Sequence, residues 1–490
     1  MIRFPSHVVV AASLMLAVSG CDGKTDDSTI LVSAIGGSAN RADPDAGPLD
    51  FPDAVTMGAT AQGLVRFDAN GQVEPGLAQR WIVIEDGTSY IFRIADATWP
   101  DGSPVDARQV ARTLTRALAP TSRNPLAPFL RSVDEVVAMT PQVVEVRLSR
   151  PRPDLLRLLA QPEMAVFRTQ TLAGTGPLRT EGVGDPIRLH SAPEPVIGPD
   201  GDEDAAAPAL RLRLRGERAS LALIRYREHL SDLVIGGTFT DWPTARQSGV
   251  AQSELNIDPA AGLFGLQMRN RDGFLADADN RAAIAMALDR KALLDPIRDD
   301  WDAAETILPE QLDSASAPAV PGWASLNDAD RAATARSRVS AWKARQKATM
   351  APLRIALPDG PGANLLWTGI ARALNAVGLS VLRVPLDARS DLKLVDAVAP
   401  LDSASWYLRT ACQACSEEAV KALDAARTAP DAAARSLRLA EADSVLTEDG
   451  VFIPLARPLR WSLVSPRLDA FQRNSRAWHP LNHLRNQDGS

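Results

Sequence analysis

Residues 353–384 read LRIALPDGPGANLLWTGIARALNAVGLSVLRV, and this stretch decides the fold class. Its first five residues, which are apolar except for Arg354, predict a strand, and residues 363–377 carry apolar side chains at helical spacing. Gly378 then marks the end of the helix, because glycine readily adopts the left-handed conformation found there. Residues 379–384 predict a second strand. A strand, a helix and a strand in this order form a parallel βαβ unit, which indicates an α/β fold.

Strands and helices alternate without a repeat on both sides of this unit. On the N-terminal side, residues 81–84 and 90–94 predict a hairpin around Asp86-Gly87. A helix follows up to residue 118, for which we expect Ser103 as the N-cap. The chain has 490 residues, too many for one hydrophobic core, so we expect more than one lobe.

The N-terminus has the order of a secretory signal. Residues 8–16 are apolar and uncharged, and Val18-Ser19-Gly20-Cys21 follows. The apolar run is shorter than the roughly 20 residues that span a bilayer. Small residues before a cysteine resemble the bacterial lipobox, which implies a signal peptide over residues 1–20 and lipidation of Cys21. An ordinary signal with an incidental cysteine is the alternative. Residues 21–29 are polar and predict a tether.

Composition excludes several function classes. The net charge of −7 is spread over both signs along the chain, which argues against a nucleic-acid partner. The chain contains no G-x-S-x-G motif, no H-E-x-x-H motif and no phosphate-binding glycine loop. Only five histidines are present. The sequence therefore predicts neither an enzyme nor a cofactor.

Three cysteines are present, and two of them form a C-x-x-C pair, Cys412 and Cys415. A local disulfide or two free thiols are both compatible with this spacing. A metal site made with His479 and His483 is the other interpretation. The distance in sequence between the two pairs differs from that of zinc sites, so we expect no metal.

Seven segments form an ordered set along the chain: AQGLVRFD (61–68), VEPGLAQRW (73–81), DGTSYIFRI (86–94), WPDGSPV (99–105), GTGPL (174–178), NRAAIAMALDR (280–290) and FIPL (452–455). Taken in order, they resemble the large solute-binding proteins of ABC importers, the family 5 proteins that bind oligopeptides, dipeptides or nickel.

The resemblance implies a two-lobed periplasmic-binding-protein fold of type II, with an extra subdomain in the first lobe. The first lobe is expected at residues 30–265 with the subdomain inserted at about 55–160, the second lobe at 266–450, and a return to the first lobe at 451–490. It also implies a monomer on the periplasmic or extracytoplasmic face that passes a peptide or small solute to ABC permease and ATPase subunits. A lipoprotein that senses a ligand or has a structural role, without transport, is the alternative.

The ligand itself stays open at this point. In the peptide-binding relatives that the chain resembles, an aromatic residue and then an aspartate hold the free amine of the peptide. Residues 395–402 read VDAVAPLD here, so the aromatic residue is missing and the aspartate is shifted to Asp396 or Asp402.

Binding sites of this kind combine aromatic walls with a few placed polar groups. We expect Asp402 to receive a cationic group and Arg409 to pair with a carboxylate. The alternative is that Trp406 and Tyr407 are core residues and Asp402 caps a turn. The full set of candidate ligand-binding residues is Trp242, Gln267, Asp402, Trp406, Tyr407 and Arg409.

Overall fold

The computed structural model describes residues 29–484 except 183, 192–195, 198–202, 205–208, 311 and 347–349. The predicted signal peptide, Cys21 and the tether up to residue 28 lie outside the described residues. In the part of the chain that is described, no helix combines the length and the apolar character that crossing a membrane requires.

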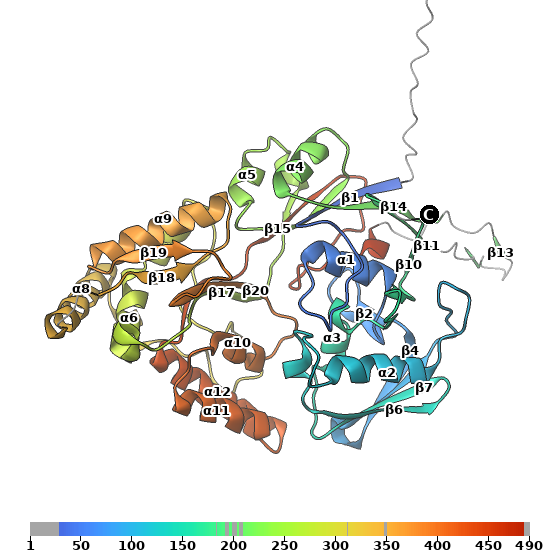
Figure 1. Ribbon diagram of the computed structural model, residues 1–490, viewed down its shortest axis with the longest axis horizontal. Helices are drawn as coiled ribbons and strands as arrows, with labels where there is room; N and C mark the ends of the chain where they lie inside the picture. The colour runs from blue at the N-terminus through green and yellow to red at the C-terminus, as the bar shows by residue number, and fades with distance from the viewer. Residues whose placement is uncertain are drawn as a thin grey trace, which may run out of the picture.

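A seven-stranded sheet forms the first lobe, with the strand order β10-β11-β14-β1-β15-β22-β16 (Figure 1). Its centre is β1, which pairs in parallel with both β14 and β15. The strands of this sheet are β1 (Thr29–Ile35), β10 (Leu178–Thr180), β11 (Ile187–Ser191), β14 (Arg211–Glu217), β15 (Leu233–Thr238), β16 (Leu255–Ile257) and β22 (Arg460–Val464). The helices of this lobe are α1 (Phe51–Thr60), α4 (Ala219–Arg227) and α5 (Trp242–Arg246).

A four-stranded antiparallel sheet forms the subdomain, with the order β4-β5-β7-β6. The predicted hairpin is its first half, because β4 and β5 pair across the turn at Asp86-Gly87. The subdomain contains β4 (Ala78–Ile84), β5 (Ser89–Ile94), α2 (Ala107–Leu118), β6 (Val133–Thr140), β7 (Val143–Leu148) and α3 (Leu155–Leu159). Short two-stranded ladders join β2 (Val65–Phe67) to β3 (Val73–Pro75), β8 (Phe167–Arg168) to β9 (Ala173–Gly174), and β12 (Val196–Ile197) to β13 (Glu203–Asp204).

The expected N-cap of α2 is wrong by three residues. Asp106 caps this helix, its carboxylate accepting from the Gln109 backbone while the Gln109 side chain accepts from the Asp106 backbone. The Ser103 hydroxyl donates instead to Asp101. Both positions fit the capping pattern, and the extended backbone around Pro104, which forms a bridge with Thr98, decides between them.

The second lobe is built on a five-stranded sheet with the order β19-β18-β20-β17-β21. The βαβ unit predicted at residues 353–384 is present, and its two strands are parallel. The strands are β17 (Gly262–Met268), β18 (Leu353–Ala356), β19 (Val381–Val384), β20 (Leu392–Val398) and β21 (Phe452–Ala456). The helices are α6 (Ala278–Ala287), α7 (Arg290–Leu294), α8 (Asp328–Arg345), α9 (Pro361–Ala376), α10 (Ala404–Ala411), α11 (Glu417–Thr428) and α12 (Ala432–Asp449).

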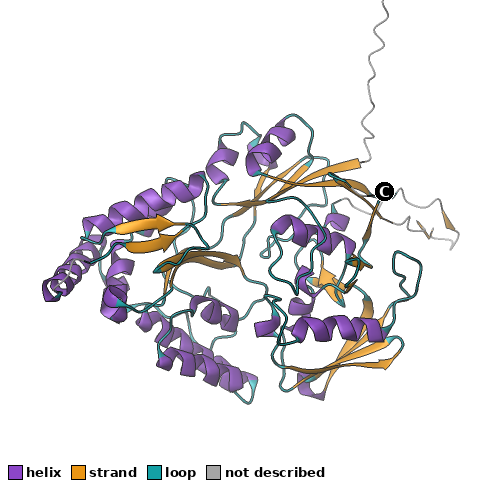
Figure 2. Cartoon of the chain, viewed as in Figure 1, coloured by secondary structure: helices purple, strands orange, loops and turns teal. Residues whose placement is uncertain are grey.

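The chain passes between the two large sheets at two places. It leaves the first-lobe sheet after β16 and enters the second-lobe sheet at β17, through residues 258–261. It returns between β21 and β22, through residues 457–459. The sequence-based boundaries at 265/266 and 450/451 therefore fall inside β17 and just before β21. Two short connections of this kind form a hinge between lobes, and Figure 2 shows in orange the strand layers that they join.

Candidate functional site

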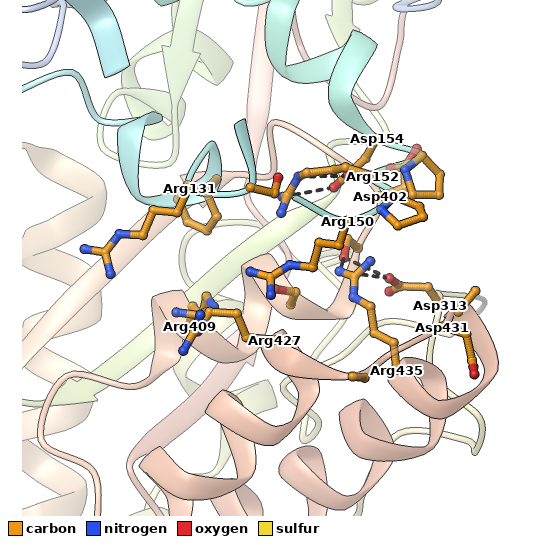
Figure 3. Close-up of a pocket in the computed structure, with 18 of the residues that line it drawn as sticks. Arg131, Arg150, Arg152, Asp154, Asp313, Asp402, Arg409, Arg427, Asp431 and Arg435 are labelled. Carbon is orange, nitrogen blue, oxygen red and sulfur yellow. Dashed lines mark hydrogen bonds and ion pairs between the residues drawn. The ribbon is translucent and has the colours of Figure 1, made fainter. Parts of the chain in front are cut away.

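A cavity of about 240 Å³ lies between the subdomain and the second lobe (Figure 3). Both bodies contribute to its wall, so a molecule held there contacts both. From the subdomain come Pro128, Phe129, Arg131, Ser132, Arg150, Pro151, Arg152, Pro153, Asp154 and Arg157, and from the second lobe Asp313, Asp402, Ser403, Ser405, Arg409, Arg427, Ala429, Pro430, Asp431, Ala432 and Arg435.

The subdomain wall is made where β7 ends. Pro151 and Pro153 cannot donate backbone hydrogen bonds to a strand, so the chain leaves the sheet there and turns into α3. The Tyr90 hydroxyl donates to the carbonyl of Arg152 at 2.8 Å and fixes this turn against β5. Arg150 and Arg152 are therefore placed at the cavity by an irregular but anchored segment.

The second-lobe wall is made by the start of α10 and by the junction of α11 and α12. Asp313 accepts from the Ser403 hydroxyl at 2.9 Å and from the Ala404 backbone at 2.6 Å, which fixes the start of α10. Ser405 and Arg409 are four residues apart, so they share the helix face that lines the cavity.

Seven arginines and four aspartates line the cavity. All four aspartates have partners within the protein. Asp154 pairs with Arg152 at 3.1 Å, and Asp313 pairs with Arg435 at 3.5 Å. Asp431 accepts from the Ala434 backbone at the start of α12.

Asp402, the fourth aspartate, pairs with Arg476 at 2.5 Å and lies 3.7 Å from Arg157. Arg476 is buried and belongs to the C-terminal segment after β22. Because this segment follows the last strand of the first-lobe sheet, the Asp402–Arg476 pair links the two lobes.

The arginines exceed the carboxylates, and the excess cations act on one another. Burial, and then the charges of Arg427 and Arg435, lower the pKa of Arg150. Burial and then Arg427 lower the pKa of Arg409, with Arg131 acting in the same direction. Figure 3 shows the Arg150 side chain directed towards Arg409 and Arg427. The cavity therefore has a positive region between its two walls.

Two of the predicted ligand-binding residues, Asp402 and Arg409, line the cavity. Trp406 and Tyr407 lie on the same helix but belong to the hydrophobic core, where they are 5% and 1% exposed. Their rings meet edge to face at 5.0 Å, and burial raises the pKa of Tyr407 to about 12.

The other two predicted residues lie elsewhere. Trp242 belongs to a separate core cluster, and the Arg298 guanidinium lies over its ring at 5.5 Å. The Gln267 amide donates to the carbonyl of Thr410 at 2.6 Å and accepts from Arg269, so it attaches β17 to the end of α10.

Cys412 and Cys415 form a disulfide directly after α10. His479 and His483 instead contact carboxylates, Asp258 at 3.1 Å and Glu74 at 2.9 Å. Among the described residues, no group of three or more His, Cys, Asp and Glu side chains is arranged to hold a metal ion.

Known proteins share both the sequence pattern and the architecture. The family profile described as bacterial extracellular solute-binding proteins, family 5 (middle part), matches residues 72–186. The Escherichia coli protein named probable deoxycholate-binding periplasmic protein YgiS is 31% identical over 150 residues, covering 26% of this chain and 28% of that protein. The Salmonella typhimurium periplasmic oligopeptide-binding protein OppA is 22% identical over 277 residues, covering 49% of each.

The crystal structure of Haemophilus influenzae OppA in complex with the peptide RPPGFSPFR superposes with a TM-score of 0.76. It covers 92% of this chain and 98% of that one, at 17% identity. Over residues 72–186 the chain therefore resembles the family 5 solute-binding proteins. Its fold is the type II periplasmic-binding-protein fold, as the sequence resemblance predicted. The matched sequence spans between about a quarter and a half of the two curated relatives' lengths.

Both aspartates considered for the ligand's amine have internal partners. Asp396 lies on β20 and pairs with Arg460 of β22 at 2.8 Å, so it links the two sheets beside the hinge. Asp402 pairs with Arg476. The sequence pattern alone could not show these pairs, because 64 and 74 residues separate the partners.

Sequence reasoning missed most of the cavity wall. The arginines at 131, 150, 152, 157, 427 and 435 were not candidates. They come from separate segments and carry no local motif. One signal was available for α10: Ser403 followed by ASWYLRTA fits a capped helix, which would have separated Arg409 from Trp406 and Tyr407.

Proposed function

We propose that this protein is a lipid-anchored solute-binding protein of the periplasmic or extracytoplasmic face, which captures a solute between its lobes and delivers it to an ABC importer. It acts as a monomer, its permease and ATPase subunits are its partners, and it catalyses no reaction. The observation that carries the proposal is the cavity whose two walls belong to the subdomain and to the second lobe.

A site shared by two bodies couples binding to domain movement. A solute that contacts both walls stabilises the closed arrangement, since only there are all of its contacts made. The two hinge connections at residues 258–261 and 457–459 allow one lobe to rotate while both sheets stay intact. A permease can then distinguish the loaded protein by its shape.

Native mass spectrometry of the mature protein purified from its own host tests capture. We expect a bound molecule that disappears after the protein is unfolded, dialysed and refolded. Loss of the bound molecule should lower the melting temperature, since a ligand of the native state stabilises it by mass action. Protein that carries nothing from its host and keeps the same melting temperature after refolding would contradict capture.

Two dyes attached to introduced cysteines, one on each body, test domain movement. Arg112→Cys on α2 and Leu437→Cys on α12 place dyes on exposed positions of the two bodies. We expect energy transfer between the dyes to differ between the loaded and the stripped protein. Identical transfer in both would contradict closure.

Cys21→Ser tests the anchor. We expect the wild-type protein in the membrane fraction with the mass of an acylated cysteine, and the variant in the soluble fraction without that mass. Stable anchoring requires more than one acyl chain. If the wild-type protein is cleaved but not acylated, the proposed lipid anchor is wrong. The fold and the proposed capture of a solute would be unaffected by that result.

A further inference from the structure

We infer that the solute held between the two lobes is a small anion, bound by Arg131, Arg150, Arg409 and Arg427. This inference rests on the proposed function and names the chemical class of the ligand. The shared chemistry is a carboxylate or a phosphate group, both of which guanidinium groups bind through paired hydrogen bonds.

The first argument is the balance of charge. Every aspartate of the cavity has a partner in the protein: Arg152 for Asp154, Arg435 for Asp313, Arg476 for Asp402 and the start of α12 for Asp431. By contrast, Arg131, Arg150 and Arg409 have no carboxylate within ion-pairing distance among the described residues. Within the described part of the chain, Arg427 pairs only with Asp424 of its own helix, at an exposed position.

The second argument is the state of Arg409. Its side chain is partly buried, and its Nη2 atom is fully buried without a hydrogen-bond partner among the described residues. A buried donor without a partner destabilises the folded protein, because its hydration is lost without replacement. An anion in the cavity would supply that partner.

The third argument is where the cations lie. Arg131 and Arg150 belong to the subdomain, whereas Arg409 and Arg427 belong to the second lobe. Like charges on opposite walls repel and oppose closure, since interactions between charges strengthen where water is excluded. An anion between the walls converts this repulsion into attraction on both sides. The same arginines thus select the charge of the ligand and couple its binding to closure.

The N-terminus of helix α12, beside these arginines, also favours a negatively charged ligand. The first residue of the 18-residue helix α12, Ala432, lines the cavity. The N-terminus of a helix carries a partial positive charge. This contribution adds to the arginines, although Asp431 offsets part of it.

A cationic amine has no place of the kind that Asp402 was expected to provide. Arg476 and Arg157 already neutralise this carboxylate. The cavity of about 240 Å³ also lies below the roughly 300–1,000 Å³ typical of sites for drug-sized ligands. A small acid fits these properties better than an extended peptide.

Thermal-shift and calorimetric titrations of the stripped mature protein test the inference at fixed ionic strength. The probes are succinate, citrate, inorganic phosphate and glucose 6-phosphate as anions, dialanine and glucose as neutral molecules, and putrescine as a cation. We expect an anion to raise the melting temperature and the neutral and cationic probes not to. Comparing the carboxylates with the phosphates identifies the acid group.

Arg150→Gln and Arg409→Gln should each weaken binding of the active anion about tenfold or more, since a hydrogen bond to a charged group is lost. Arg372→Gln, an exposed arginine of α9, is the matched control and should bind normally. Equal melting temperatures of the ligand-free variants and the wild type show that the variants fold.

The outcomes separate the two proposals. A neutral or cationic molecule, either from the probe set or released from the host-purified protein, that binds wild type and both variants equally would overturn the anion inference and leave solute capture intact. Anion binding that both variants retain would also overturn it. A protein that carries nothing from its host and responds to no probe contradicts the proposed function itself.

Discussion

Arg281 of α6 and Arg409 of α10 are both largely removed from solvent, yet they differ in one respect. The Arg281 side chain is completely buried, and it donates to the Asp449 carboxylate and to the carbonyls of Asp449, Leu275 and Ala276. All of these partners belong to the second lobe. Arg409 has a buried nitrogen without a partner and faces cations of the subdomain.

The comparison teaches how to separate a structural arginine from a binding one. Burial does not distinguish them, and neither does charge. What differs is whether the donors are satisfied and whether the neighbouring groups belong to one lobe or two. Three of the four substitutions below test this distinction, and Asp443→Asn applies the same question of unsatisfied partners to a buried carboxylate. They are ordered by the size of the expected effect on stability.

The largest effect should come from Asp449→Ala. Asp449 accepts from Arg271, from Arg281 and from the Ser416 backbone. Removing one side of a buried ion pair costs about 3–5 kcal/mol, because the other charge stays buried without a partner. Urea denaturation should show this loss of unfolding free energy, with anion affinity unchanged in the folded fraction. A cost under 1 kcal/mol would mean that Arg281 is not structural.

Asp443→Asn should stabilise the protein, because Asp443 is a buried charge with too few partners. It accepts from the Ala319 backbone at 2.7 Å, its Oδ1 has no partner among the described residues, and burial raises its pKa to about 6. The carboxyl is ionised in the unfolded chain above about pH 4, whereas in the folded protein it ionises only above about pH 6. Stability is therefore lost as the pH rises through this window.

The variant should gain roughly 2 kcal/mol at pH 7, and its advantage should disappear below about pH 4. Melting curves of both proteins between pH 4 and pH 8 measure the difference. An advantage that does not depend on pH would show that the gain has another cause.

Asp402→Asn should cost about 1 kcal/mol, since the half-exposed partner of Arg476 is lost while the Ala399 carbonyl still accepts from that arginine. The same change makes the cavity more positive, so anion affinity should increase about threefold. Calorimetry with the active anion measures this. A loss of binding would instead indicate that Asp402 contacts a cationic group of the ligand.

The smallest effect should come from the double variant Arg150→Gln, Arg409→Gln without ligand. Its unfolding free energy should stay within about 0.5 kcal/mol of the wild type or rise slightly, because only repulsive contacts are removed. Differential scanning calorimetry compares the two proteins. A loss comparable to that of Asp449→Ala would place these arginines with Arg281 as structural residues.

The sequence predicted the fold better than the site for a physical reason. The βαβ unit at 353–384 and the hairpin at 81–94 depend on periodicity and turn residues within a short window, so their patterns are readable locally. The cavity is assembled from segments near residues 130, 150, 313, 405 and 430. Nothing in the sequence around Arg150 indicates that Arg427 lies across from it.

Within the candidate site, Asp402 and Arg409 line the cavity, whereas Trp406 and Tyr407 on the same segment belong to the core. Ser405 and Arg409 are four residues apart and share the helix face that lines the cavity, whereas Trp406 and Tyr407 lie on the side that packs into the core. The sequence pattern of this segment does not show by itself which residues of α10 face the cavity and which face the core.

The position of β22 in the first-lobe sheet has a consequence for how the protein is made. This strand, Arg460–Val464, lies between β15 and β16, and Leu468, Leu481 and Leu484 complete the core beneath the sheet. A ribosome must therefore synthesise nearly the whole polypeptide before this half can finish folding. Until then the nascent chain lacks an interior strand of this sheet, and a premature stop codon at or before position 484 would remove residues of this core.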